Sequence, residues 1–185
     1  MKRIVLLFIV VFLNNFAFSQ NHKFEYGLTP VNFNFPVGKN FQDNFKPSVG
    51  FGLYGFYNLT DFVSLGLDGG YIFHFINKDY NSFKIKVMNI SPAIKLQHYF
   101  NKFKVYMLVG YGLYQWSTTP YNILATQIGG KSLNVGGFKG ELGIMFKTAP
   151  NWELGAGLTY HYINSIGDIK PARYLTTAIK GSFKI

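Results

Sequence analysis

The chain has 185 residues and a formal net charge of +10, and 19% of its residues are aromatic while only 14% are charged. It contains no cysteine, which excludes a disulfide framework, a thiolate metal site and a cysteine nucleophile. Since an average protein carries about 25% charged residues, this composition argues against a water-soluble domain.

The N-terminus predicts a cleaved signal peptide over residues 1–19. Lys2 and Arg3 precede an unbroken apolar run over residues 4–13, and cleavage is expected after Ser19. The run is far shorter than the roughly 20 residues of a transmembrane helix. We therefore expect an exported protein with a single mature domain of residues 20–185, whose net charge falls to +8 once the signal is removed.

Alternation of apolar and polar residues predicts strands along the whole mature chain, and no segment has a sustained helical period. In the first strand the apolar parity changes near Pro30, which predicts a bulge because proline cannot donate to a ladder. Eight strands are expected, over residues 23–35, 48–58, 62–75, 84–100, 103–116, 136–147, 152–163 and 173–185.

The connections between these strands alternate in length. Short turns are expected at residues 59–61, 101–102 and 148–151, and longer loops at 36–47, 76–83, 117–135 and 164–171. Every long loop then lies at one end of the sheet, with both termini at the other end. This pattern is typical of an antiparallel up-and-down transmembrane β-barrel with short periplasmic turns and longer extracellular loops.

The strand faces support a barrel in a membrane. Lipid offers no partner to backbone amides, so strands can span it only in a closed barrel, and a crossing takes about 9 to 11 residues. An eight-stranded barrel has an interior that side chains fill, so we expect no open pore. Aromatic girdles are expected at the strand ends, from Tyr57, Phe62, Phe73, Phe75, Tyr99, Phe103, Phe146, Trp152, Tyr160, Tyr162 and Phe183.

Charged residues fall mainly on the polar parity and therefore predict a charge network inside the lumen. A plug that satisfies buried charge is the favoured interpretation, and a proton or ion pathway is the alternative. The expected network has Asp68, Lys95, Glu141 and Lys180 at one level, and Glu153, Lys104 and Lys184 nearer the periplasmic end.

His161 is the one candidate for catalysis. The segment around it resembles the His-x-Ser-Asn element of outer-membrane lipid A deacylases, but the position of the nucleophilic serine is Ile163. Ser165 could replace that serine, yet the last strand offers no acid to orient the imidazole. We interpret His161 as a lining residue, and a lipid A acyl hydrolase that uses His161 remains the second hypothesis.

Other site signals are weak. The glycines of residues 50–55 match a dinucleotide-binding pattern, but the segment continues as a strand with no helix after it. No pair of histidines has the spacing of metal ligands. We therefore expect no cofactor and no metal, and export argues against a nucleic-acid partner.

Residues 57–65, 90–100 and 146–158 have a strand and turn rhythm that resembles the small porin-like outer-membrane barrels of the OmpA-type superfamily. The resemblance implies a monomer in the outer membrane of a Gram-negative bacterium. It also implies contact with outer-membrane lipid and lipopolysaccharide, and insertion by the barrel-assembly machinery. The family usually ends in an aromatic residue, whereas this chain ends in Phe183, Lys184 and Ile185.

Three functions are compatible with these features. The first is a non-enzymatic outer-membrane barrel with a structural or interaction role through its extracellular loops, above all residues 117–135. The second is the lipid A acyl hydrolase. The third is a secreted lipocalin-like barrel with its apolar parity inside, which strand length, aromatic ends and low charge disfavour.

Overall fold

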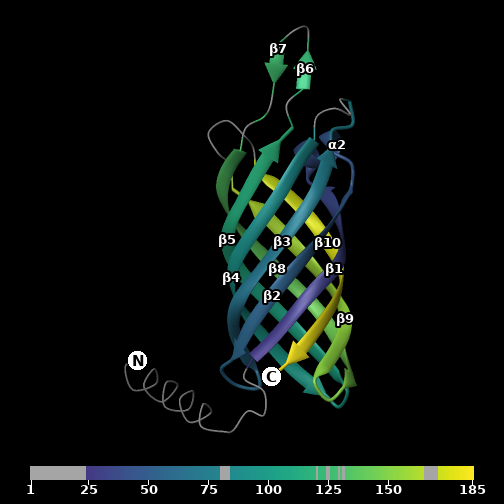
Figure 1. Cartoon of the computed structure of the whole chain (residues 1–185), viewed down its shortest axis with the longest axis vertical. Coiled ribbons are helices and arrows are strands. Elements are labelled where there is room, and N and C mark those ends of the chain that lie inside the picture. The colour runs from purple at the N-terminus through teal and green to yellow at the C-terminus, as the bar shows by residue number, and fades with distance from the viewer. Residues whose placement is uncertain are drawn as a thin grey trace, which may run out of the picture.

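A computed structural model describes residues 24–79, 84–119, 121–123, 126–128, 130, 132–164 and 171–185. Eight long antiparallel strands close into a barrel in the order β1-β10-β9-β8-β5-β4-β3-β2 (Figure 1). These strands are β1 (Phe24–Val37), β2 (Ser48–Asn58), β3 (Val63–Ile76), β4 (Lys84–Phe100), β5 (Phe103–Thr118), β8 (Ser132–Ala149), β9 (Trp152–Ile163) and β10 (Ala172–Lys184). The predicted eight-stranded up-and-down barrel is confirmed, and the expected signal peptide lies outside the described residues.

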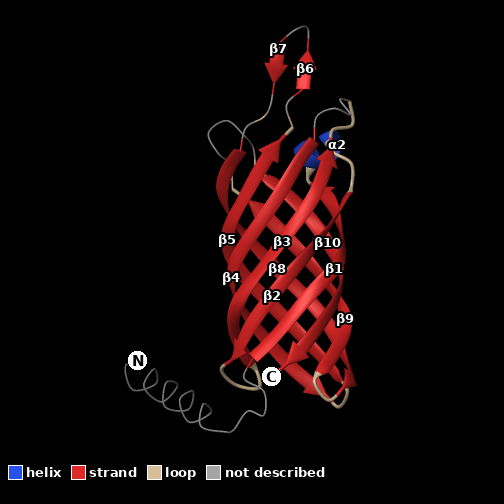
Figure 2. Cartoon of the chain, viewed as in Figure 1, coloured by secondary structure: helices blue, strands red, loops and turns tan. Residues whose placement is uncertain are grey.

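Two elements lie outside the barrel wall, in loops that the sequence left without structure. The helix α2 (Lys39–Asn44) follows β1, and β6 (Tyr121–Ile123) pairs with β7 (Thr126–Ile128) in the connection from β5 to β8. Figure 2 shows both at the same end of a molecule made almost entirely of strands. No helix among the described residues is long and apolar enough to cross a membrane.

β5 and β8 extend further than the alternation predicted. They remain paired at Gln115 with Asn134 and at Ser117 with Ser132, beyond the expected ends at residues 116 and 136. These four polar residues lie on the outward face, whereas the inward pair between them, Trp116 and Leu133, is apolar. Backbone pairing continues past the end of the outward apolar pattern, which was the signal that set the predicted strand ends.

Both ends of the described chain lie at the end of the short turns, opposite α2 and the β6–β7 hairpin (Figure 1). This end is the periplasmic side of the barrel. The tightest turn joins β4 to β5 through Asn101 and Lys102, and Asn101 has a φ of 57°. Asparagine adopts this left-handed conformation at lower cost than most residues, which explains its place in a two-residue turn.

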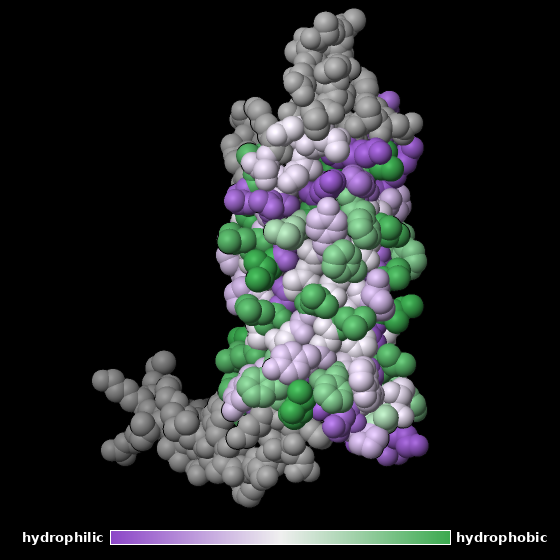
Figure 3. Space-filling view, viewed as in Figure 1, coloured by the Kyte–Doolittle hydropathy of each residue, from purple (hydrophilic) through white to green (hydrophobic). Residues whose placement is uncertain are grey.

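The two faces of the wall have opposite character, as the alternation predicted. Outward residues are large, apolar and exposed, with Leu67 at 53% and Leu142 at 62%, whereas the inward Ser64 is 0% exposed. On the face seen in Figure 3, apolar residues form a broad band with hydrophilic residues above it. No described residue covers this apolar surface, which is the lipid-facing side of a transmembrane barrel.

Bulges decide the exceptions to this alternation. The register of β1 shifts between Leu28 and Val31 on the β10 side, which confirms the bulge predicted at Pro30. A second bulge, which the sequence did not predict, lies in β3 between Ile72 and Phe75. It turns Phe75 inward to 0% exposure, so the prediction that Phe75 belongs to a girdle is wrong. Tyr99 also faces the lumen and not the lipid, as the hydrogen bond from its hydroxyl to Glu153 shows. The prediction that it belongs to a girdle is therefore wrong as well.

Candidate functional site

Side chains fill the lumen at three levels, which we name by position. The periplasmic cluster comprises Glu25, Lys95, Tyr99, Lys104, Glu153 and Lys184, and the mid-lumen cluster comprises Asp68, Tyr106, Lys139, Glu141 and Lys180. The extracellular plug is a set of buried apolar residues, Phe41, Ile72, Phe75, Ile85, Val87, Tyr114, Val135, Ile163, Ala172 and Tyr174.

In the periplasmic cluster, Lys104 lies between two carboxylates. Its Nζ is 3.1 Å from Glu25 Oε2 and 2.5 Å from Glu153 Oε2, and the side chain is 1% exposed. Lys95 Nζ lies 2.8 Å from the same Glu25 oxygen. Each charge at this level thus has an opposite charge in contact, which a dry interior requires.

Glu153 of β9 has the largest number of partners in this cluster. Besides Lys104, its carboxylate accepts from Lys184 Nζ at 2.5 Å, from the Tyr99 hydroxyl at 3.0 Å and from the Ser182 hydroxyl at 3.2 Å. These groups come from β4, β5, β9 and β10. One carboxylate therefore ties together both sides of the barrel at its periplasmic end.

In the mid-lumen cluster, Glu141 of β8 pairs with Lys180 of β10. The same carboxylate accepts from the Tyr106 hydroxyl at 2.5 Å and from the Thr159 hydroxyl at 3.1 Å. Lys180 also lies over the ring of Tyr54, with its Nζ 4.8 Å from the ring centroid. The ion pair is thus packed between aromatic rings, with hydrogen bonds on both carboxylate oxygens.

A second mid-lumen ion pair joins Asp68 of β3 to Lys139 of β8, across the barrel. The sequence placed Asp68 in the network but left out Lys139. It also left out Glu25, although Glu25 has the opposite parity to Phe24 and Tyr26 and therefore points inward. The change of parity at Pro30 obscured that signal.

The structure brings together Glu141 and Lys180, and it gathers Lys104, Glu153 and Lys184 at the periplasmic end. Lys95 is a correction. It was placed level with Glu141, but it contacts Glu25 and belongs to the periplasmic cluster. The tilt of the strands and the bulge in β1 set these heights, so residue counting along separate strands could not give them.

Glycines make room for the lumen's rings. A Cβ added to Gly143 would lie 2.3 Å from Cζ of Tyr106, and one added to Gly27 would lie 2.0 Å from Cζ of Tyr54. With any larger residue at position 143 or 27, the ring of Tyr106 or Tyr54 would have to move. The absence of side chains at these two positions therefore allows Tyr106 to reach Glu141 and Tyr54 to contact Lys180.

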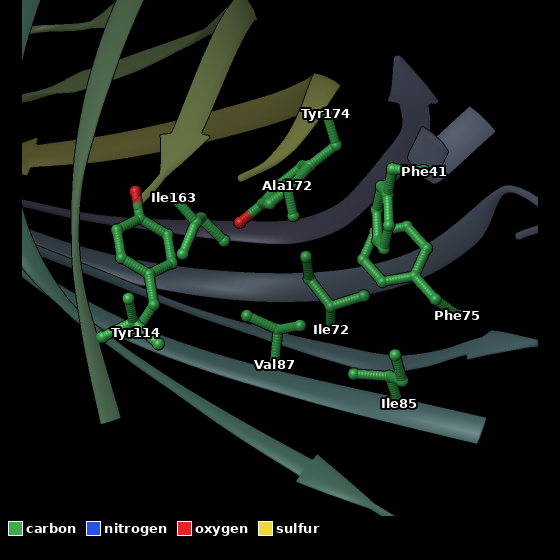
Figure 4. Close-up of a cluster of buried hydrophobic side chains, with 10 residues drawn as sticks. Phe41, Ile72, Phe75, Ile85, Val87, Tyr114, Ile163, Ala172 and Tyr174 are labelled. Carbon is green, nitrogen blue, oxygen red and sulfur yellow. The ribbon is translucent and has the colours of Figure 1, made fainter. Parts of the chain in front are cut away.

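The extracellular plug closes the other end of the lumen. Phe41 of α2 packs against Phe75 and Trp116, with ring centroids 5.1 Å and 5.7 Å apart. Figure 4 shows Phe41 beside Phe75 at one side of the cluster and Tyr114 at the other, with Ile72 and Val87 between them. α2 therefore contributes one ring that caps an aromatic and aliphatic layer.

His161 lies where the plug meets the mid-lumen cluster. Its Nδ1 is 3.0 Å from the Tyr114 hydroxyl, and its ring stacks on Tyr174 with a centroid distance of 4.2 Å and an interplanar angle of 13°. Among the described residues no serine and no carboxylate is hydrogen-bonded to its ring. Ile163 is buried in the plug, and Ser165 lies outside the described residues.

One small cavity lies between the mid-lumen cluster and the plug. It has a volume of about 40 Å³ and is bordered by both mid-lumen ion pairs, by His161 and by Tyr174. This volume holds only a few water molecules. Within the described part of the chain, no group of three or more histidine, aspartate or glutamate residues is placed to hold a metal ion.

A closed barrel with a lipid-facing wall and a filled polar lumen is the architecture of bacterial outer-membrane proteins. The family model described as "Outer membrane protein beta-barrel domain" matches residues 4–182. The chain belongs to this family. No curated protein sequence matches it.

Solved structures of other outer-membrane barrels have the same fold as this family member. Neisserial surface protein A is 16% identical with a TM-score of 0.66, over 88% of this chain and 97% of that one. The attachment invasion locus protein Ail of Yersinia pestis, in complex with the heparin analogue sucrose octasulfate, is 14% identical with a TM-score of 0.59, over 90% and 100%. The N-terminal barrel domain of Pseudomonas aeruginosa OprF is 13% identical with a TM-score of 0.56, over 89% and 100%. At these identities the similarity shows the fold alone.

Proposed function

We propose that this outer-membrane barrel is a non-enzymatic protein whose lumen is a structural core and whose extracellular loops make its interactions. The observation that carries the proposal is the filling of the lumen at three successive levels. Two of these levels pair every charge with an opposite charge, and the third is an apolar plug. A permanent aqueous path needs a polar wall in contact with water along its whole length, and the plug interrupts it.

The surroundings of His161 support a lining role over catalysis. A hydrolase of the serine and histidine type needs its nucleophile and base in hydrogen-bond reach, with a third group that orients the base. The imidazole here contacts two tyrosines, and the ring of Tyr174 covers one of its faces. It is therefore packed as part of the wall.

The loops are the part of the molecule that is free to bind. The β6–β7 hairpin projects beyond the barrel (Figure 1). Its sequence, YNI in β6 and TQI in β7, is uncharged. A rigid barrel that holds an uncharged hairpin away from the membrane is suited to contact with a protein partner.

A planar-bilayer recording tests the closed lumen. The wild type is expected to give no reproducible, selective conductance, and Lys180→Ala is expected to behave in the same way, since the plug above stays in place. A selective conductance in the wild type that Lys180→Ala alters would overturn the structural role of the lumen.

Mass spectrometry of lipid A tests the absence of hydrolase activity. Cells with and without the gene are expected to show the same acyl pattern, and cells that express His161→Ala are expected to match both. Loss of an acyl chain that depends on His161 would establish the hydrolase instead.

Removal of the hairpin tests whether the loop belongs to the fold or is displayed by it. A short turn in place of residues 119–131 is expected to leave the heat-modifiable, folded form and its midpoint of urea unfolding unchanged. A barrel that no longer folds would show that the hairpin serves the scaffold.

A further inference from the structure

A groove in the outer wall of the barrel runs across β2, β3 and β4. It has a volume of about 540 Å³. Its floor is Gly69, and its walls are the outward side chains of Phe51, Leu53, Leu67, Tyr71, Met88 and Ile90. The groove is thus open to the lipid and apolar.

The groove exists because Gly69 occupies an outward position among large neighbours. Gly69 pairs with Leu53 on one side and with Ile90 on the other. Along its own strand the flanking outward residues are Leu67 and Tyr71. A Cβ added at Gly69 would have the Asn89 carbonyl oxygen 3.4 Å away as its nearest neighbour, so the position is not closed by packing.

Basic residues continue the same face toward the extracellular end. Beyond Met88, the next outward residues of β4 are Lys86 and Lys84, and Lys86 is about 7 Å along the strand from Met88. Neither ammonium group has an ion-pair partner among the described residues.

Acidic residues do not neutralise this face within the described chain. At the extracellular end the described carboxylates are Asp43 of α2 and Asp79, which follows β3. Both lie in the loops and not on the outward face of β4. Lys84 and Lys86 therefore form a positive site directly above an apolar groove.

We propose that Lys84, Lys86 and the Gly69 groove bind one molecule of lipopolysaccharide from the outer leaflet. A lipid phosphate contacts the two ammonium groups, and one acyl chain lies in the groove. A basic site above an apolar groove matches the phosphate and the acyl chain of a phospholipid or glycolipid. Because the two lysines lie toward the extracellular end, the bound lipid is the phosphorylated one of the outer leaflet. Acyl chains gain no hydrophobic energy by leaving the bilayer for a groove, so the selectivity comes from packing and charge.

Native mass spectrometry of the mature barrel in detergent tests the groove. Titration with a rough lipopolysaccharide that retains both lipid A phosphates is expected to show one bound molecule. Gly69→Leu fills the groove and is expected to weaken binding roughly threefold to tenfold through lost van der Waals contacts. The matched control is Gly140→Leu, another outward glycine, where an added Cβ has no neighbour within 4 Å.

The same titration tests the basic residues. Lys84→Ala with Lys86→Ala is expected to weaken binding about 25-fold at low salt, at about fivefold for each lysine near a phosphate surface. The control removes the same charge at the periplasmic end with Lys102→Ala and Lys147→Ala, which is expected to change binding less than twofold. Dephosphorylated lipopolysaccharide is expected to bind the wild type as weakly as the phosphorylated form binds the lysine variant.

Three results would overturn the proposal. They are equal loss of binding in Gly69→Leu and Gly140→Leu, equal loss in the two lysine pairs, and binding of phosphatidylglycerol as tight as that of lipopolysaccharide. Heat modifiability of each variant on a gel confirms that the barrel is folded before its binding is compared. None of these readouts depends on conductance or on hydrolysis, so the site and the proposed function can fail separately.

Discussion

The periplasmic cluster and the extracellular plug fill the same lumen with opposite chemistry. Lys104 at one end is 1% exposed and Tyr114 at the other is 0% exposed, so both regions are equally dry. The first is held by ion pairs among residues of five strands, and the second by aromatic and aliphatic contacts that α2 caps. A narrow barrel can thus be closed either by paired charge or by apolar packing.

The difference predicts unequal responses to substitution. A buried ion network loses its balance when one partner is removed, because the remaining charge stays buried without a partner. An apolar layer at the mouth loses contacts, but water can enter the space from outside. Four substitutions compare the two regions and the boundary between them.

Glu153→Ala is expected to have the largest effect. It leaves Lys184 without the carboxylate it contacts and leaves Lys104 with Glu25 alone, and the expected loss in the free energy of unfolding is about 3–5 kcal/mol. Reversible urea unfolding in lipid vesicles measures it, with Asp61→Ala in an exposed turn as the control. A loss below about 1 kcal/mol would mean that water reaches the cluster and that the contrast with the plug is false.

Phe41→Ala is expected to come next, with a loss of about 3 kcal/mol, near the low end for a buried phenylalanine because water can fill the mouth. The ring packs on Trp116, so the fluorescence of Trp116 is expected to shift to the red in a Trp152→Phe background. Asp43→Ala, an exposed position of the same helix, serves as the control. Unchanged fluorescence and stability would show that α2 does not close the lumen.

Tyr106→Phe is expected to cost about 1.5 kcal/mol, because it removes a charge-assisted hydrogen bond of 2.5 Å to Glu141. The loss is smaller than for Glu153→Ala since Lys180 and Thr159 still contact the carboxylate. Tyr111→Phe on the outward face of the same strand is the control. Equal unfolding midpoints for the two variants would contradict the role of this hydroxyl.

His161→Phe is expected to have the smallest effect, about 1 kcal/mol, because a phenyl ring keeps the stacking on Tyr174 and only the Tyr114 hydroxyl loses a partner. Combination with Tyr114→Phe removes that unpaired hydroxyl, so the double variant is expected to be more stable than the sum of the single losses implies. Additive losses would show that the two side chains do not interact.

Alternation of apolar and polar residues in the sequence was sufficient to predict which residues of the barrel wall face the lipid and which face the lumen. Leu65, Leu67 and Asp68 of β3 lie on the faces that their parity predicted, since a strand in lipid has only two sides and lipid tolerates one kind of residue. The same parity indicated that His161, Glu141 and Lys180 face inward. It failed at Phe75, where an unpredicted bulge reverses the faces.

The sequence alone therefore determined the number of strands in the barrel wall, most of the lipid-facing residues and the inward direction of most charges, because each depends on local periodicity. Only the tertiary structure decided which charges meet. Strand tilt and the two bulges set the heights at which Glu25 contacts Lys95 and Asp68 contacts Lys139 across the lumen. The plug under α2 and the groove at Gly69 also depend on neighbours that are distant in sequence, and closure of the barrel brings these neighbours together.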